Sequence, residues 1–405
     1  MINITKNQAQ DEALNMINKF DNLLLSWATG VGKSLAFIKI QEKINPNGIT
    51  YIVVNETNHI NNWKEEYIKH KKEHLLKNTK IFCYASLKKY VNSNIGLLCL
   101  DEAHHSITNL RIDYLKSIIA PKIIALTATL TENQKLDLDN IFGKPFKEYN
   151  INLNQALNNN IIAKPTIYLV PLELNYFKDT VFYEESRGIK AKRIVIEDHL
   201  DNKYKYSNKA HYPNVNFRFK TTEQQKYKLI NDNIEFQKIR YQNSGGNIFF
   251  KNKWLNTCSL RKRYLGELKT PYIKKIIDLI GDAKFICSTT SIKQSEEIGD
   301  DTNTIHSKKN NILNEQIIDN FNKDIIKSII TVDKLQEGQN LYNIDAAIIT
   351  QLDNSTRSFI QKTGRALRSD NPRIYVLYFK NTRDEEFLEN VYSSINSEYI
   401  KILNI

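Results

Sequence analysis

The 405-residue chain is poor in the residues that build disulfide-stapled or repetitive proteins. Its 4 cysteines include no CxxC pair, which disfavours a disulfide framework or zinc knuckle and indicates reduced core thiols. Only 13 glycines and 8 prolines exclude collagen-like and low-complexity architectures. No apolar run approaches the roughly 20 residues of a membrane span, and the first residues lack the apolar core of a signal peptide. We therefore expect a soluble, cytoplasmic protein with no membrane partner.

Positive charge is in excess and lies mainly in one segment. The chain has 57 Lys+Arg and 45 Asp+Glu, a formal net charge of +12. Residues 186–263 hold 18 of the basic and 6 of the acidic residues, which is also a net of +12. Aromatic residues are interleaved with these cations, a composition that suits phosphate neutralisation and base stacking. A solvated Lys-rich insertion with a small aromatic core explains the composition equally well.

Short apolar runs alternate with amphipathic stretches on both sides of this basic segment, as in parallel βα units. We expect two α/β lobes flanking an irregular basic segment, with a hinge at Asn150–Asn160. Strands are predicted at residues 23–28, 49–54, 80–85, 96–100, 122–128, 284–288, 328–332, 345–350 and 373–379. Helices are predicted at 33–43, 61–74, 109–117, 272–280 and 314–322, with one or two more within 384–403.

A phosphate-binding loop is predicted between the first strand and its helix, where residues 27–34 read WATGVGKS. Gly30 and Gly32 allow the backbone to curl, so that the N–H groups from Thr29 through Val31 to Lys33 face a phosphate at a helix N-terminus. Lys33 is expected to reach the β- and γ-phosphates of ATP, and the Ser34 hydroxyl to bind Mg²⁺. Trp27 replaces the first glycine of the GxxxxGK[ST] pattern, so we expect an altered mouth of the nucleotide pocket.

Two acids follow another predicted strand, in the string DEAH at residues 101–104. Parallel α/β sheets place their chemistry at the carboxyl ends of strands, which is where these acids lie. Asp101 is expected to hold Mg²⁺, and Glu102 to orient or activate the attacking water. A DEAH string after a glycine loop therefore predicts ATP hydrolysis.

With these motifs the chain resembles superfamily 2 helicases and translocases with DEAH or DExH signatures, in the branch of type III restriction motors and phage recombination helicases. Gln10 in QDEAL resembles the glutamine that recognises adenine in this family. Thr127 and Thr129, in the string TAT, resemble the motif that couples hydrolysis to movement. The resemblance also implies that two further first-lobe segments lie near the nucleic-acid strand. One carries Trp63, and the other carries Tyr84 and Ser86, which are candidate nucleic-acid contacts.

In the second half, residues 331–341 resemble a family motif centred on Gly338, which the resemblance assigns to the nucleotide site. The string QKTGRALR resembles the QxxGRxxR arginine-finger motif, in which Gln361, Arg365 and Arg368 are implied catalytic residues. The fold implied is α/β with two tandem RecA-like parallel-sheet lobes. The first lobe is expected at residues 1–160, and the second at 161–405 with the basic aromatic-rich insertion at about 177–263.

The function predicted is an ATP-dependent, nucleic-acid-stimulated helicase or translocase of a bacterial or phage setting, with ATP and Mg²⁺ as cofactors. In QxxGRxxR and in the spacing of residues 126–143 the chain resembles DNA-acting members more closely than DEAD-box RNA helicases. This resemblance implies DNA over RNA, with replication or recombination intermediates as expected substrates. An ATP-dependent clamp without translocation and an RNA helicase are the alternatives. Candidate nucleic-acid contacts in the basic segment are Lys203, Lys205, Arg218, Lys220, Lys251, Lys253 and Arg261.

Overall fold

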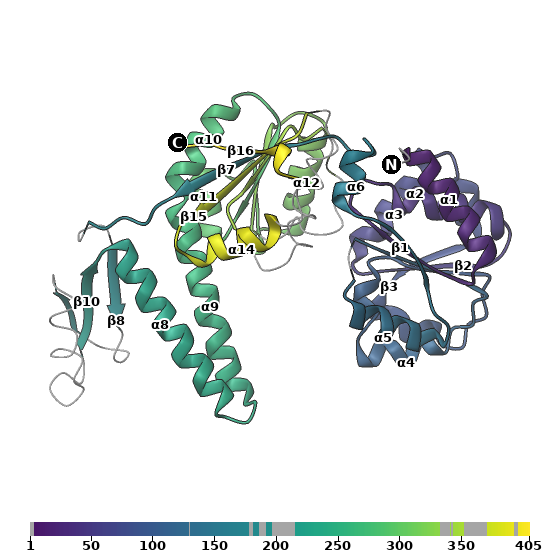
Figure 1. The fold of residues 1–405 in the computed structure, drawn as a ribbon, viewed down its shortest axis with the longest axis horizontal. Coiled ribbons are helices and arrows are strands. Elements are labelled where there is room, and N and C mark those ends of the chain that lie inside the picture. Colours follow the sequence, from purple (N-terminus) through teal and green to yellow (C-terminus); the bar gives the residue numbers. More distant parts are fainter. Residues whose placement is uncertain are drawn as a thin grey trace.

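The computed structural model describes residues 4–128, 130–177, 181–185, 192–196, 215–332, 341, 343–351, 371–392 and 396–405. Two parallel sheets, one in each half of the chain, form two lobes that lie side by side in Figure 1. A helical arm projects from the second lobe, away from its sheet (Figure 1). These two sheets confirm the predicted fold class.

The first lobe contains a six-stranded sheet in the order β3-β2-β4-β5-β1-β6, in which every neighbouring pair is parallel. Its strands are β1 (Asn22–Trp27), β2 (Thr50–Val54), β3 (Thr79–Cys83), β4 (Leu97–Leu100), β5 (Lys122–Thr127) and β6 (Lys147–Ile151). Its helices are α1 (Lys6–Lys19), α2 (Lys33–Ile44), α3 (Thr57–Lys69), α4 (Asn109–Lys116), α5 (Glu132–Phe142) and α6 (Leu153–Asn158). Three short 3₁₀ turns complete it: η1 (Glu73–Asn78), η2 (Tyr84–Tyr90) and η3 (Ala103–His105).

The central strands of this sheet are buried on both faces, which explains their continuous apolar sequences. Side chains alternate along β1, so Leu23 and Leu25 pack into the core beneath α1, α2 and α3, whereas Leu24 packs on the opposite face with η2, α4 and α5. Because parallel strands share one direction, the loops after β1, β4 and β5 all leave the same edge of the sheet.

The second lobe contains a seven-stranded sheet in the order β12-β13-β11-β14-β15-β7-β16, again with parallel pairs throughout. Its strands are β7 (Thr166–Leu172), β11 (Phe285–Thr289), β12 (Thr304–Ile305), β13 (Ser328–Val332), β14 (Ala346–Ile349), β15 (Arg373–Phe379) and β16 (Ile400–Ile402). Its helical segments are α10 (Thr270–Ile280), α11 (Ile292–Ile298), α12 (Asn311–Asn322), α14 (Arg383–Tyr392) and the 3₁₀ turn η5 (Ser397–Tyr399).

The basic segment is not irregular, which corrects the sequence-based expectation. It contains a three-stranded sheet of β8 (Val181–Glu185), β10 (Val215–Thr221) and β9 (Lys192–Ile196), followed by two long helices, α8 (Glu223–Gln242) and α9 (Ile248–Leu268). α8 and α9 form the antiparallel hairpin that projects in Figure 1. At the base of this hairpin, Tyr227 and Tyr264 pack in the second-lobe core. The Arg383 N–H donates to the Tyr227 hydroxyl at 2.8 Å. These contacts fix the arm to the second lobe.

Two further stretches can be compared with the sequence-based expectations. The Asn-rich stretch 150–160 contains the end of β6 and the helix α6, whose N-cap Asn152 forms a capping box with Gln155, and the hinge expected there stays a prediction. The C-terminal stretch is not only helical, because Ile400–Ile402 joins the sheet as β16 beside β7. β6 ends at Ile151 and β7 begins at Thr166, so the predicted lobe boundary at residue 160 falls between the two sheets.

All four cysteines are free thiols, and burial raises the pKa of Cys99 and of Cys287. Within the part of the chain that the structure describes, no helix is both long and apolar enough to cross a membrane.

Candidate nucleotide and nucleic-acid sites

The glycine loop joins the carboxyl end of β1 to the first turn of α2. Gly30 has φ +91° and Gly32 has φ +99°, both in the left-handed region that glycine adopts without steric cost. Gly32 is the N-cap of α2, which begins at Lys33, so the free N–H groups of the helix N-terminus lie at this loop. The predicted loop residues Thr29 to Ser34 therefore surround a site suited to an anion.

Helix α1 packs closely against this loop. A Cβ atom placed on Gly32 lies 2.8 Å from Lys6 Cε and 2.9 Å from Gln10 Nε2, so both side chains would have to move, and the φ of +99° favours glycine in addition. Lys6 Nζ also donates to the Gly30 carbonyl at 3.1 Å. Lys6 was missed in the sequence, although its position one helical turn before Gln10 was a usable signal.

Two glutamines of α1 have different surroundings. The Gln8 side chain accepts from the Thr5 N–H at 2.8 Å and completes the N-terminal capping box. Gln10 is fully buried beside Gly32, and neither its amide oxygen nor its nitrogen has a hydrogen-bond partner among the described residues. Because buried polar groups are nearly always paired, an orphaned amide next to a phosphate-type loop fits a nucleotide ligand.

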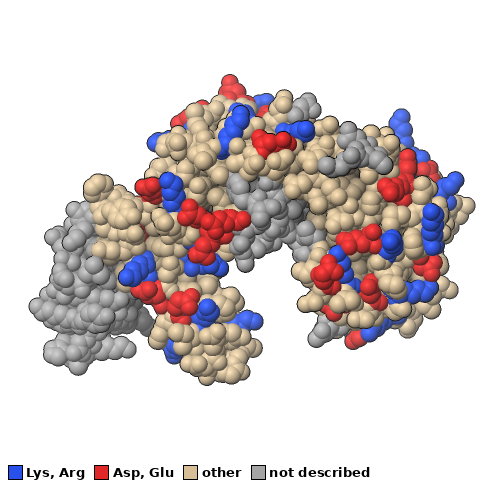
Figure 2. All heavy atoms as spheres, viewed as in Figure 1, with Lys and Arg blue, Asp and Glu red and all other residues tan. Residues whose placement is uncertain are grey.

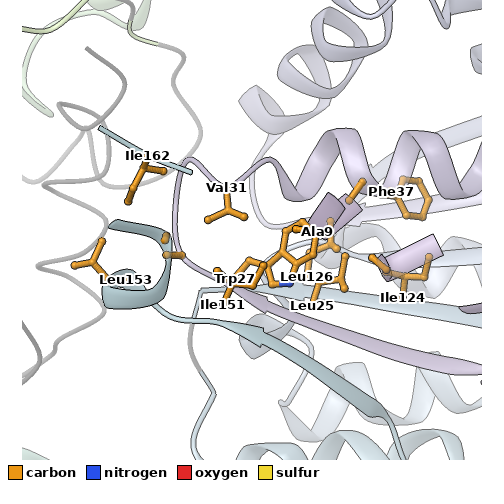
Figure 3. Close-up of a cluster of buried hydrophobic side chains, with 14 of the residues drawn as sticks. Ala9, Leu25, Trp27, Val31, Phe37, Ile124, Leu126, Ile151, Leu153 and Ile162 are labelled. Carbon is orange, nitrogen blue, oxygen red and sulfur yellow. The ribbon is translucent and has the colours of Figure 1, made fainter. Parts of the chain in front are cut away.

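Lys33 and Trp27, at the two ends of the loop, differ in their surroundings. Lys33 Nζ donates to the Trp27 carbonyl oxygen at 2.9 Å, so the ammonium lies over the loop. The Trp27 side chain is fully buried within a cluster of hydrophobic side chains (Figure 3). Its ring lies edge-to-face to that of Tyr149, with 5.5 Å between the ring centroids. The expectation that Trp27 alters the mouth of the pocket is therefore wrong, because it shares a strand face with Leu25.

The acidic pair follows β4. Glu102 has φ +46° and ψ +60°, a left-handed conformation that is uncommon for a residue with a Cβ. Residues in this conformation occur often at functional sites. His104 Nδ1 lies 3.5 Å from Glu102 Oε2, and the His104 ring is tilted by 40° against the His105 ring, with 4.0 Å between their centroids. The Asp101 carboxylate accepts from Trp63 Nε1 at 2.8 Å.

The structure corrects the role expected for Tyr84. Its side chain is 1% exposed and donates through its hydroxyl to the Asp101 carbonyl at 3.1 Å, so it faces the acidic pair and is closed off from a nucleic-acid strand. Burial and the neighbouring Asp101 raise the pKa of Tyr84, which keeps the hydroxyl proton in place for this bond. Trp63 is likewise buried, at 3% exposure. Ser86 is half-buried and remains a candidate nucleic-acid contact.

The order of the strands brings the first-lobe motifs together. β4, β5 and β1 are consecutive in the sheet, and they carry respectively the acidic pair, Thr127 and the glycine loop at their carboxyl ends. With about 4.8 Å between neighbouring strands, the ends of β1 and β4 lie about 10 Å apart. Thr127 is fully buried at the end of β5, and Thr129 lies outside the described residues.

The donors at this edge fit Mg²⁺ bound together with a nucleotide. No group of three or more His, Cys, Asp or Glu side chains that could hold a metal occurs in the described part of the chain. The Ser34 hydroxyl and the Asp101 carboxylate are hard oxygen ligands. One or two protein oxygens plus phosphates and waters is the usual Mg²⁺ set.

The predicted second-lobe site residues lie outside the described residues; they are Gly338, Gln361, Arg365 and Arg368. The chain enters their segments from the carboxyl ends of β13 and β14, which flank β11 in the sheet.

The predicted nucleic-acid contacts of the basic segment are separated by the fold. Lys203 and Lys205 lie outside the described residues, and Arg218 and Lys220 belong to β10. Lys251 and Lys253 are exposed on α9 near the tip of the arm. Arg261 instead lies between the two helices, where it donates to Asn231 Oδ1 at 2.9 Å.

Comparisons with known families and structures agree with this geometry. Residues 3–132 match the family model described as type III restriction enzyme, res subunit, and residues 269–370 match the helicase conserved C-terminal domain. No protein with a curated description matches the sequence.

Solved structures share the fold at low identity. The Pyrococcus furiosus Hef helicase domain is 13% identical with a TM-score of 0.50, over 95% of this chain and 97% of that one. S. cerevisiae Dbp5 bound to RNA and ADP BeF3 is 12% identical with a TM-score of 0.56, over 98% and 89%. Mss116p bound to ssRNA and AMP-PNP is 14% identical with a TM-score of 0.58, over 98% and 74%.

Proposed function

Since the chain belongs to the superfamily 2 helicases, ATP-hydrolysing enzymes that act on nucleic acid, we propose that it uses ATP to unwind or remodel DNA, with replication or recombination intermediates as substrates. The observation that carries the proposal is the shared edge of β4, β5 and β1, which gathers the glycine loop and the acidic pair. Neither the loop nor the acids alone constitute an ATPase, but together they supply phosphate binding, a metal ligand and a base.

The residues of this edge divide the work of phosphoryl transfer. Mg²⁺ with ATP supplies charge neutralisation at the phosphates, and Ser34 and Asp101 would hold it. Lys33 exchanges the Trp27 carbonyl for phosphate oxygens, so its charge moves onto the ligand. Glu102 orients the attacking water and takes up its proton, with its carboxylate held 3.5 Å from His104.

The second lobe completes the site in this proposal. Arg365 and Arg368 bring positive charge to the γ-phosphate when the lobes close, and an arginine finger is typically worth about 10³–10⁵ in rate. The family resemblance assigns Gln361 to catalysis and Gly338 to the nucleotide site, and the proposal keeps both roles. Hydrolysis is thereby coupled to opening and closing of the lobes, which moves the protein along a strand.

DNA is the proposed substrate because the first-lobe match is to a restriction-enzyme subunit, whose name refers to an enzyme acting on DNA. Dbp5 and Mss116p, by contrast, are described as bound to RNA. At 12% and 14% identity, these two structures support a common fold with this chain. RNA is therefore kept as the alternative substrate.

We place one contact with DNA at the tip of the α8–α9 arm. Residues 236–255 contain the cations Lys238, Arg240, Lys251 and Lys253 and no Asp or Glu. Large apolar side chains are exposed among them, including Phe249 at 58% and Ile248 at 72%. In the view of Figure 2 the end of the arm is mostly uncharged surface.

Cations and aromatic rings are paired at this tip. The Arg240 guanidinium lies 5.5 Å from the Phe236 ring centroid and 4.7 Å from that of Phe250, and Lys253 Nζ lies 4.5 Å from the Phe249 centroid. A cation beside an exposed ring offers a phosphate contact and a stacking face within one nucleotide, which is the pattern of single-strand binding sites.

Charge reversal at the tip tests this contact. The double variant Lys251→Glu/Lys253→Glu is expected to bind DNA more weakly and to lower the slope of log affinity against log salt by about 1.5, since each phosphate contact contributes roughly 0.7–0.9. ATP hydrolysis without DNA should be unchanged. A matched control reverses two exposed lysines far from the arm tip, Lys274→Glu/Lys323→Glu. Equal losses in both double variants would refute the contact.

Substrate choice and translocation are tested together. ATP hydrolysis is measured at fixed salt with single-stranded, duplex and forked DNA and with RNA, alongside displacement of a labelled strand. The proposal expects stimulation by a DNA form and ATP-dependent displacement. Stimulation by RNA alone would establish the RNA alternative, and turnover without displacement would establish an ATP-dependent clamp.

A further inference from the structure

The Asp101 carboxylate is held by hydrogen bonds on both of its oxygens. Trp63 Nε1 donates to Oδ2 at 2.8 Å, and the Glu102 N–H donates to Oδ1 at 3.1 Å. A carboxylate oxygen can accept more than one hydrogen bond, so each keeps capacity for a further ligand. Two donors at fixed positions leave the carboxylate one orientation.

Trp63 is itself immobile. It lies in the middle of α3 and is 3% exposed, with an edge-to-face contact to Phe37 at 5.6 Å and a tilted contact to Tyr67 at 6.3 Å. The indole N–H is a donor only, and a buried indole needs a partner for it. In this core that partner is the carboxylate of Asp101, on a different element of the lobe.

The backbone of Asp101 is fixed as well. Its N–H donates to the Val53 carbonyl at 2.9 Å, and its own carbonyl accepts from the Tyr84 hydroxyl at 3.1 Å. The guanidinium of Arg111 lies over the Tyr84 ring, 5.3 Å from the ring centroid. With the backbone held by β2 and η2, Trp63 is the side chain that sets where the carboxylate points.

We propose that Trp63 is a positioning residue for the divalent cation of the ATP site: its indole N–H fixes the Asp101 carboxylate in the orientation that receives the cation. The proposal rests on the proposed function, in which Asp101 is a Mg²⁺ ligand. Partners that orient a metal ligand typically change metal affinity or activity by about 10–100-fold when they are lost. A tryptophan that only fills the core gives no such effect.

Trp63→Phe removes the N–H and keeps an aromatic ring against Phe37 and Tyr67. The readout is the binding of a fluorescent ATP analogue during a Mg²⁺ titration, with a parallel measurement in chelator. We expect the Mg²⁺ concentration for half-maximal enhancement of binding to rise about 10-fold or more, with nucleotide affinity in chelator unchanged. Tyr67→Phe is the matched control, because Tyr67 belongs to the same aromatic cluster. Its hydroxyl donates to the Gln41 side chain and makes no bond to Asp101.

An unchanged Mg²⁺ midpoint in folded Trp63→Phe overturns the proposal. Absence of any Mg²⁺-dependent binding by the parent protein is a different result, because it overturns the ATP-site assignment as well.

A second measurement uses the parent protein and does not depend on the variant folding. The indole N–H resonances of its 3 tryptophans are followed by NMR while Mg²⁺ is added with ADP, after assignment through Trp27→Phe and Trp254→Phe. The Trp63 resonance is expected to move with the cation, since its acceptor becomes a metal ligand. A Trp63 resonance that does not respond while Mg²⁺·ADP binds also overturns the proposal.

Discussion

Replacing Gln10 with methionine, which has a similar length and volume, is expected to change stability and ATP affinity in opposite directions. An unpartnered buried polar group costs about 1–3 kcal/mol. Without nucleotide, Gln10→Met should therefore have a free energy of unfolding at least as high as that of the parent protein, and up to about 1–3 kcal/mol higher. In the adenine-recognising role that we propose for it, Gln10 would make two hydrogen bonds of about 0.5–1.5 kcal/mol each to the base. Their loss is expected to lower ATP affinity about 5- to 150-fold.

Urea unfolding followed by circular dichroism measures the first quantity, and calorimetric titration with ATP and with GTP measures the second. Gln8→Met is the matched control in the same helix. Its amide belongs to the N-terminal capping box, so that variant should lose about 0.5–2 kcal/mol of stability and keep its ATP affinity. A loss of stability in Gln10→Met like that of Gln8→Met, or an unchanged ATP affinity, would refute the assignment.

Two further predictions concern the loop and the second lobe. Gly32→Ala should strongly lower ATP hydrolysis, because alanine is strained at φ +99° and its Cβ displaces the Lys6 and Gln10 side chains beside the loop. Gly143→Ala, where φ is +64° and no atom lies within 4 Å of the new Cβ, should cost only about 1 kcal/mol in urea unfolding and keep hydrolysis. Lys269→Met should destabilise the protein by about 3–5 kcal/mol in the same assay, because it removes the cation that pairs with the buried Asp384 carboxylate. Lys269 Nζ lies 2.6 Å from Asp384 Oδ2, and the Asp384 side chain is 9% exposed. Lys380→Met breaks an exposed ion pair and should cost less than about 1 kcal/mol. Comparable unfolding curves for the two lysine variants would contradict the second prediction.

The sheets were predictable because strands buried on both faces are apolar throughout and end abruptly. The run at Leu23–Trp27 and the run at Leu97–Leu100 each became a central strand. The arm was not predictable in the same way. Its helices bury apolar residues such as Ile230 only near the lobe, and expose others such as Phe236 at the tip, so no single apolar stripe runs along their length.

For the candidate site, local spacing predicted the glycine loop and the acidic pair, since each is a short string tied to the end of one strand. The two-residue alternation along the strand also implied the burial of Trp27, because it places Trp27 on the same face as Leu25. The contact of Trp63 with Asp101 joins residues 38 positions apart and has no local signature. It depends on how α3 packs over the sheet, which only the tertiary structure defines.

We propose that the edge formed by β4, β5 and β1 is an ATPase site that responds to nucleic acid. Its most direct measurement is the rate of phosphate release by the parent protein and by Lys33→Ala, side by side, with and without forked DNA. We predict Mg²⁺-dependent release that DNA accelerates in the parent, and none above background in Lys33→Ala. Release by purified Lys33→Ala at close to the parent rate would contradict the account.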